Sequence, residues 1–258
     1  MKPEDIERVK DLLPTSLGSD EIRSQIAADI LRRSVFSARM EDARYLAKIR
    51  EVCTAMSGAE INQADARAQL LTVLEQMGHS PQDAGGLKNP ASIRRLNLIL
   101  DTQTQMASSV ARLSEQTEAT LELFPAWELT RLESRKMPRE DWMARWTAAG
   151  NSVNWEGAVK RQFIALKNSP IWQALGDGAG GFRDTLGNPY PPFAYGSGLD
   201  WLDVDRETCE KLGLLGGTGS VPSGRDGARP SLSPDEQDIA DAIAKFGFPS
   251  IGDGLEVS

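Results

Sequence analysis

Four carboxylates near residue 200 are the side chains whose spacing most directly suggests chemistry: Asp200, Asp203, Asp205 and Glu207. An EF-hand calcium loop needs oxygen ligands at its first, third, fifth and twelfth positions and glycine at its sixth. Counted from Asp203, the twelfth position is a leucine and the sixth a threonine, which excludes an EF-hand loop. The same carboxylates could pair as general acid and base, so an enzyme of unknown class using residues 200–207 is one alternative. We expect instead a capped, solvated turn, with Asp203 capping a helix at about 204–212.

Other residues that could bind a metal or a phosphate are too few or wrongly spaced. Cys53 and Cys209 lie far apart without a CxxC pair, and His79 is the one histidine of the chain. The glycine-rich stretch GLLGGTGS at 213–220 lacks the Lys-Ser/Thr pair of a phosphate-binding loop. We therefore expect no metal, no cofactor and no catalytic residue, and we interpret residues 216–232 as a flexible linker.

The charge of the chain argues against nucleic-acid binding as its main activity. The net charge is -8 and the pI about 4.9, whereas nucleic-acid binding is driven by clustered Lys and Arg. One stretch is nevertheless basic and is a candidate contact for a partner or for double-stranded DNA: Arg32, Arg33, Arg39, Arg44 and Lys48. A solvated helix face is the simpler explanation of these cations. A nucleic-acid-binding assembly factor that uses a basic helix over residues 32–50 is the second alternative.

No segment predicts a membrane span or secretion. The longest apolar runs, such as LNLIL at 96–100, fall far short of the roughly 18 residues that a span needs. The opening MKPEDIERVK lacks the apolar stretch of a signal peptide. We expect the chain to stay in the cytoplasm of the cell that makes it.

Apolar residues at helical spacing predict a mainly helical first half. Helices are expected at 2–13, ending at Pro14, and at 63–77, ending at Gly78. Residues 31–56 predict a long amphipathic helix with a break near Ser34 or Ser37. Inside the apolar stripe of that helix stands Asp42, which we interpret as one half of a structural ion pair.

A longer helix is predicted from about residue 91 to 121, and it carries Gln103 in the middle of its apolar face. A buried amide needs hydrogen-bond partners for its oxygen and for both of its N–H hydrogens. We therefore expect Gln103 to tie this helix to a neighbouring backbone or to an arginine. The loop-like segment 80–90 precedes the helix.

The stretch after this helix is rich in indole rings. Its spacing predicts two short helices within residues 124–150, separated at Met137-Pro138, whose rings pack onto the helical body. The rings concerned, with one that follows shortly after, are Trp127, Trp142, Trp146 and Trp155.

The segment NPYPPFAYGSGLDW, residues 188–201, combines three prolines with glycines and aromatic rings. Prolines restrict the backbone, glycines permit a sharp turn, and the rings need a surface to cover. We predict a rigid, extended strap across the end of the helical body, preceded by a strand at 163–166 and a helix starting near Ser169-Pro170. Its candidate residues are Pro191, Pro192, Phe193, Gly196, Gly198 and Trp201.

Two stretches carry a resemblance to a known family. The first is LNLILDTQTQMASSVARLSEQTEATLELFPAWELTRLESRKMPREDWMARW at 96–146. The second runs from RQFIALKNSPIWQAL through NPYPPFAYGSGLDWLDVDRETCEKLGLL, residues 161–215. Together with RRSVFSARMEDARYLAKI at 32–49, they resemble the phage minor head proteins of the Mu protein F-like, head-morphogenesis family over most of residues 25–215.

This resemblance implies a structural protein of a tailed-phage head without an enzymatic reaction. The expected partners are the portal protein, the major capsid protein or both, packaged double-stranded DNA, and further copies of the chain in a low-copy assembly. The expected location is the virion head, and the host cytoplasm during assembly. Many members end in a Cys/His-rich segment, whose place is taken here by the proline-rich stretch, so no metal site is carried over.

The C-terminal stretch SPDEQDIADAIAKFGF, residues 233–248, has strong signals for a helix start. Ser233 is a suitable N-cap, Pro234 suits the first helical position, and Glu236 completes a capping box. We expect a short tethered helix that docks on a partner or on its own body through Ile239, Ile243 and Phe246.

These expectations define the fold class and the organisation of the chain. The class is mainly α, a helical bundle with a small α+β C-terminal region. Residues 1–150 form the helical body and 151–215 the α+β region with the strap. The linker 216–232 and the C-terminal helix and tail, 233–258, follow.

Overall fold

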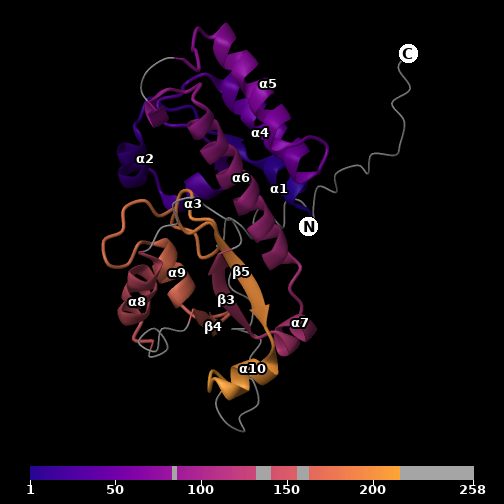
Figure 1. Ribbon diagram of the computed structural model, residues 1–258, viewed down its shortest axis with the longest axis vertical. Helices are drawn as coiled ribbons and strands as arrows, with labels where there is room; N and C mark the ends of the chain where they lie inside the picture. The colour runs from indigo at the N-terminus through magenta and orange to yellow at the C-terminus, as the bar shows by residue number, and fades with distance from the viewer. Residues whose placement is uncertain (83–85, 132–140, 156–162, 216–258) are drawn as a thin grey trace, which may run out of the picture.

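The computed structural model describes residues 1–82, 86–131, 141–155 and 163–215, and within them the predicted mainly α class is confirmed. Figure 1 shows an elongated molecule with the N-terminal helices at one end and a small sheet with its own helices toward the other. The linker 216–232, the helix and tail 233–258 and the predicted break at Met137-Pro138 lie outside the described residues.

The N-terminal half is built from short helices around two longer ones. Its elements are α1 (Pro3–Val9), β1 (Asp11–Leu12), α2 (Ser19–Gln25), α3 (Ala28–Arg32), β2 (Ser34–Val35), α4 (Ala43–Ser57) and α5 (Gln63–Gln76). The predicted helix at 63–77 is confirmed: Asn62 caps its start through two backbone N–H groups, and Gly78 follows its end with a φ of 86°.

Two very short paired strands lie where two helices were predicted, so the predicted extents of these helices were wrong. β1 and β2 run parallel, with Asp11 opposite Ser34 and Leu12 opposite Val35. The first helix therefore ends at Val9 instead of residue 13, and the long helix predicted over 31–56 is interrupted at Ser34, one of its two expected break points. Tertiary pairing here overrides the local helical pattern.

A long helix and its short continuation connect the two halves. After η1 (Gly86–Lys88) come α6 (Ile93–Ser114) and α7 (Glu118–Leu123). The helix predicted to reach residue 121 is therefore interrupted. Thr117 begins the new helix by accepting a hydrogen bond from the Thr120 N–H, while its own N–H donates to the Thr120 hydroxyl.

The described part of the C-terminal half is a three-stranded antiparallel sheet with three helices. Its elements are β3 (Ala126–Arg131), α8 (Trp142–Ser152), β4 (Ile164–Leu166), α9 (Ile171–Gly176), β5 (Leu199–Val204) and α10 (Arg206–Lys211). The strand order is β4-β3-β5. The predicted strand at 163–166, the helix starting near Ser169-Pro170 and the second helix of 124–150 are confirmed.

Strand β3 corrects the first of the two helices predicted within 124–150. Trp127 and Leu129 point into the core, and Glu128 between them is only half-buried, which is the alternation of a strand. β3 lies within the segment 1–150 that was assigned to the helical body, yet it is the central strand of the sheet. Its pairing with β4 and β5 decides its conformation.

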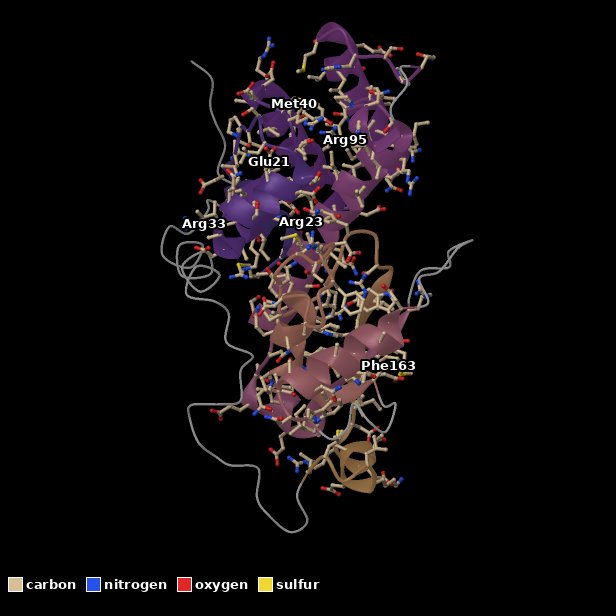
Figure 2. The ribbon with its side chains drawn as sticks, turned by 90° about the vertical axis from the view of Figure 1, so that its left-hand side faces the viewer. Glu21, Arg23, Arg33, Met40, Arg95 and Phe163 are labelled. Atoms are coloured by element: carbon tan, nitrogen blue, oxygen red, sulfur yellow. The ribbon has the colours of Figure 1, made fainter. Side chains whose placement is uncertain are left out.

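Helix α6 runs through two separate hydrophobic cores. Its first half contributes Leu96 and Leu100 to the core formed with α4 and α5. Its second half contributes Met106 and Val110 to the core formed with β3, α8, α9 and β5. Figure 2 shows the same two halves from the side, with Arg95 in the N-terminal half and Phe163 in the other.

A buried ion pair at the end of α1 is hydrogen-bonded to α6 between these two cores. Lys10 Nζ donates to Glu7 Oε1 at 3.1 Å and to Gln103 Oε1 at 2.6 Å. Burial raises the pKa of Glu7, while the ammonium of Lys10 opposes this shift. Gln103 thus ties α6 to a neighbour as predicted, but its partner is a lysine rather than an arginine or a backbone group.

Replacing Lys10 should destabilise the protein strongly. In Lys10→Met the carboxyl of Glu7 stays buried without its cation, and the free energy of unfolding should fall by about 3–5 kcal/mol. Urea denaturation measures this loss. Lys2→Met is the matched control, because the Lys2 side chain is 76% exposed. Equal losses in the two variants would contradict the role of the buried pair.

Candidate functional site

The predicted strap is a buried turn rather than an extended surface segment. Tyr190 and Phe193 expose 1% and 0% of their surface. The Pro191–Pro192 peptide bond is cis, and Gly196 and Gly198 have φ values of 60° and 65°, which glycine adopts without a steric penalty. The rings do cover a surface, as predicted, but the chain turns back on itself inside the second core.

The rings of this turn belong to one aromatic cluster that draws on five parts of the chain. Trp127 of β3 stacks on Trp201 of β5, with ring centroids 3.7 Å apart. Trp172 of α9 meets both of these rings edge-on at 5.8 Å. It also contacts Trp146 of α8 at 5.3 Å and Phe193 of the turn at 6.0 Å. Aromatic pairs of this kind stabilise a core beyond the area that they bury.

Hydrogen bonds attach the turn and β5 to the N-terminal half. Arg32 Nη1 donates to the Gly187 carbonyl at 2.8 Å. Gln105 Nε2 donates to the Leu199 carbonyl at 2.7 Å, and Arg112 Nη1 to the Trp201 carbonyl at 3.1 Å. Side chains of α6 therefore satisfy carbonyls on the outer edge of β5, which would otherwise be open to another strand.

The turn also packs directly on the end of α9. A Cβ added at Gly176 would lie 1.8 Å from the Asn188 carbonyl oxygen. The Gly187 N–H donates to the Gly176 carbonyl at 3.0 Å. This close backbone contact leaves no room for a side chain at residue 176.

The basic candidates do not form the predicted helix over residues 32–50. Arg32 ends α3, Arg33 follows it, Arg39 has a φ of 58° in the connection, and Arg44 and Lys48 lie on α4. Because β2 and the following turn separate α3 from α4, the five cations do not share one helix face.

Several of these cations also have structural partners. Arg32 is bound to the Gly187 carbonyl as described above. Arg44 pairs with Asp42 at 2.6 Å, and Lys48 pairs with Glu51 at 2.6 Å. Asp42 is thus part of an ion pair as predicted, and it also caps α4 by accepting the Arg44 and Tyr45 N–H groups. Their partners reduce the positive charge that Arg44 and Lys48 could offer to DNA.

The acidic candidates are likewise separated. Asp200 pairs with Arg112 at 3.3 Å, and Asp203 accepts from Lys167 Nζ at 2.6 Å and from Trp127 Nε1 at 3.1 Å. Asp203 was expected to cap the following helix, but it lies in β5. Asp205 is the cap of α10, because its side chain accepts the Thr208 N–H, and this hydrogen bond lowers its pKa.

The last of the four, Glu207, pairs with Lys211 on the surface of α10 at 2.6 Å. Each of the four carboxylates therefore has its own partner on a strand or helix. They do not converge on a common point where a general acid and a general base could act together.

Lys167 and Arg145 are two of the buried cations that were not identified from the sequence. Lys167, whose side chain is 4% exposed, binds Asp203 and lies over the ring of Trp127. Arg145 lies between Asp141 and Asp184, at 2.8 Å from each, and over the ring of Phe182. The i,i+4 spacing of Asp141 and Arg145 is the one local signal, since the other partners are distant in sequence.

Two shallow grooves are open on the described surface. One, of about 230 Å³, lies between α6 and the start of β5 and is lined by polar residues that include Asp101, Ser108 and Asp200. The other, of about 400 Å³, lies between α4 and α5 and is lined by residues that include Lys48, Val73 and Met77. Neither combines deep burial with converging polar groups, the features expected of a small-molecule site.

Comparisons with models of protein families, with curated proteins and with solved structures find no match for this chain. In the described part of the chain, no helix is both long and apolar enough to cross a membrane. Among the same residues, no three His, Cys, Asp or Glu side chains are grouped so that they could hold a metal ion.

Adding one methyl group at Gly176 should disrupt the packing of the turn. Gly176→Ala places a Cβ against the Asn188 backbone, so the free energy of unfolding should fall by about 3 kcal/mol or more. Gly58→Ala is the control, because its Cβ would meet nothing closer than 3.5 Å. Thermal and urea unfolding of both variants measure the difference. A Gly176→Ala variant as stable as Gly58→Ala would show that the close contact is absent.

The ion pair of Asp42 should make stability depend on pH in acid. The hydrogen bond from Arg44 lowers the pKa of Asp42 from 3.8 to about 2. Because the folded-state pKa is lowered, the stabilisation is present above pH 3.8 and is lost as the pH falls through about 2. Asp42→Asn should therefore melt below the unsubstituted chain near neutral pH, and the difference should shrink toward pH 2. A difference that is unchanged over this acid range would contradict the assignment.

Proposed function

We propose that this chain is a structural minor head protein of a tailed phage, which assembles beside the portal or the inner capsid and has no catalytic site of its own. Its partners are then the portal protein, the major capsid protein or both. Packaged double-stranded DNA and further copies of the chain are additional candidate partners. The chain would act in the host cytoplasm during assembly and remain in the virion head.

The observation that carries this proposal is where the residues of the resemblance lie in the fold. The stretch 96–146 supplies most of α6, α7, β3 and the start of α8. The stretch 161–215 supplies β4, α9, the buried turn, β5 and α10. The two stretches meet in one sheet and one aromatic cluster, in which Trp127 stacks on Trp201. The two stretches that resemble the phage family are therefore the ones that build a common core. This is expected if the resemblance reflects a shared fold.

The enzyme alternative has less support from the same residues. A general acid and base need carboxylates that share one site, often with perturbed pKa values. The carboxylates at 200–207 instead pair with Arg112, Lys167 and Lys211 or cap α10. Carboxylates that are each engaged in their own ion pair or helix cap favour a structural role over a catalytic one.

The DNA-binding alternative also loses support. Over residues 1–114 the chain has fifteen Lys and Arg against fifteen Asp and Glu, so the part that contains the basic stretch has no excess of positive charge. The whole net charge of -8 arises after residue 114. The cations at 32–48 are divided among separate elements. Weak, salt-dependent binding to duplex DNA would support this alternative, and binding that is absent at low salt would remove DNA as a partner.

The copy number in purified particles tests the proposal. Particles produced from the genome that encodes the chain should contain it in far fewer copies than the major capsid protein, as measured by quantitative mass spectrometry with isotope-labelled peptides. The portal protein in the same sample calibrates the count. Absence from particles, or a copy number equal to that of the capsid protein, would overturn the proposal.

A further inference from the structure

One face of the three-stranded sheet is only half covered. The register of the strands sets cross-strand rows on the face opposite the aromatic cluster: Leu166, Ala126 and Val204 form the first row, and Ile164, Glu128 and Leu202 the second. Neighbours along a strand on one face are about 7 Å apart, so the second row lies directly beside the first.

The first row is covered by the end of the described chain. Cys209 of α10 is fully buried against Ala126 and Val204, and Leu214 and Leu215 pack partly buried on the same cluster. A hydrogen bond from the Leu214 N–H to the Cys209 carbonyl at 2.9 Å turns the chain back onto this face.

The second row is only partly covered: Ile164 packs against the first-row cluster, and Leu202 is the exposed member. Leu202 is 46% exposed, although it is a large apolar residue on a strand. Ile164 and Glu128 in the same row are half-buried. The exposed apolar side chain of Leu202 beside a covered row is a surface that another apolar element could complete.

We propose that the C-terminal segment of this same chain, residues 233–246, docks on the second row beside α10. The described chain ends at Leu215, on this face, and 43 residues follow it. The seventeen residues from 216 to 232 span about 20–25 Å as a random coil, well beyond the distance of about 7 Å between rows.

The chemistry of the segment fits the row. If residues 233–246 are helical as predicted, then Ile239, Ile243 and Phe246 form one narrow apolar stripe, which matches a single row better than a broad face. A helix of this length is marginal in water without tertiary contacts, so docking would also stabilise it.

Attachment to the same chain favours this occupant over a separate partner. If residues 216–232 behave as the linker that their composition predicts, the segment is held at an effective concentration in the millimolar range, which a separate protein seldom reaches. The proposal does not depend on a role in phage heads, because it concerns contacts within one chain.

Chemical labelling in the full chain tests the proposal. With Leu202→Cys as the reporter, a maleimide should label the thiol about tenfold faster or more when Ile243→Asp is also present, since a charge in the stripe should release a segment held by a millimolar tether. Ala244→Asp is the matched control, because residue 244 lies opposite the stripe and should leave Cys labelling slow. The unsubstituted chain measures the background from Cys53 and Cys209, both of which are buried.

Two further measurements decide between occupants. Leu123→Cys, a reporter on the 61% exposed side chain at the end of α7, should label at one rate with Ile243→Asp and with Ala244→Asp. Leu202→Cys with Ile243→Cys should form an intrachain disulfide faster than Leu202→Cys with Ala244→Cys. Equal labelling of Leu202→Cys in both Asp variants would overturn the proposal. Protection that grows with protein concentration would overturn it in favour of a second copy, and protection only after addition of another head protein would do so in favour of a partner.

Discussion

The buried pair of Lys10 and Glu7, together with Gln103, is the polar constraint that fixes how α1 lies on α6, the helix shared by both halves. Two buried charges are costly to desolvate, and they are tolerated because each meets the other and Gln103 accepts a second hydrogen bond from Lys10. This polar contact lies between the core that holds Leu100 and the core that holds Met106. Apolar packing alone would allow α1 to slide along α6, whereas a buried ion pair with an amide partner defines one register.

The second half is held together by an aromatic core as well as by the ion pairs of Lys167 and Arg145. Trp127, Trp172 and Trp201 interlock, and the buried turn closes over them with Phe193. Close backbone contact at Gly176 and hydrogen bonds from α6 to β5 then fix the turn against its neighbours. The aromatic core and the covered edge of β5 together fix the position of the buried turn.

Local sequence signals predicted the elements that depend on nearby residues. The start of α5 at Asn62 and its end before Gly78 follow from capping chemistry, and the burial of the tryptophans follows from their size. The strands that begin at Asp11 and Ser34 have two residues each, which is too short for the alternation of apolar and polar residues that marks a strand. Their pairing interrupted two predicted helices. The prediction of one basic helix over residues 32–50 was wrong for the same reason. Asp205 rather than Asp203 caps α10, because β5 extends to Val204.

Continuity of α6 has a mechanical consequence. A helix of 22 residues is about 33 Å long, and its backbone hydrogen bonds run unbroken from one core into the other. The described halves therefore share one continuous helix and are not joined by a hinge. If one core unfolded, the apolar residues that α6 contributes to it would be exposed, and the same helix would lose part of the packing that holds it against the other core. A force applied at the α4–α5 end would be transmitted along this helix as compression and would reach the sheet with little bending.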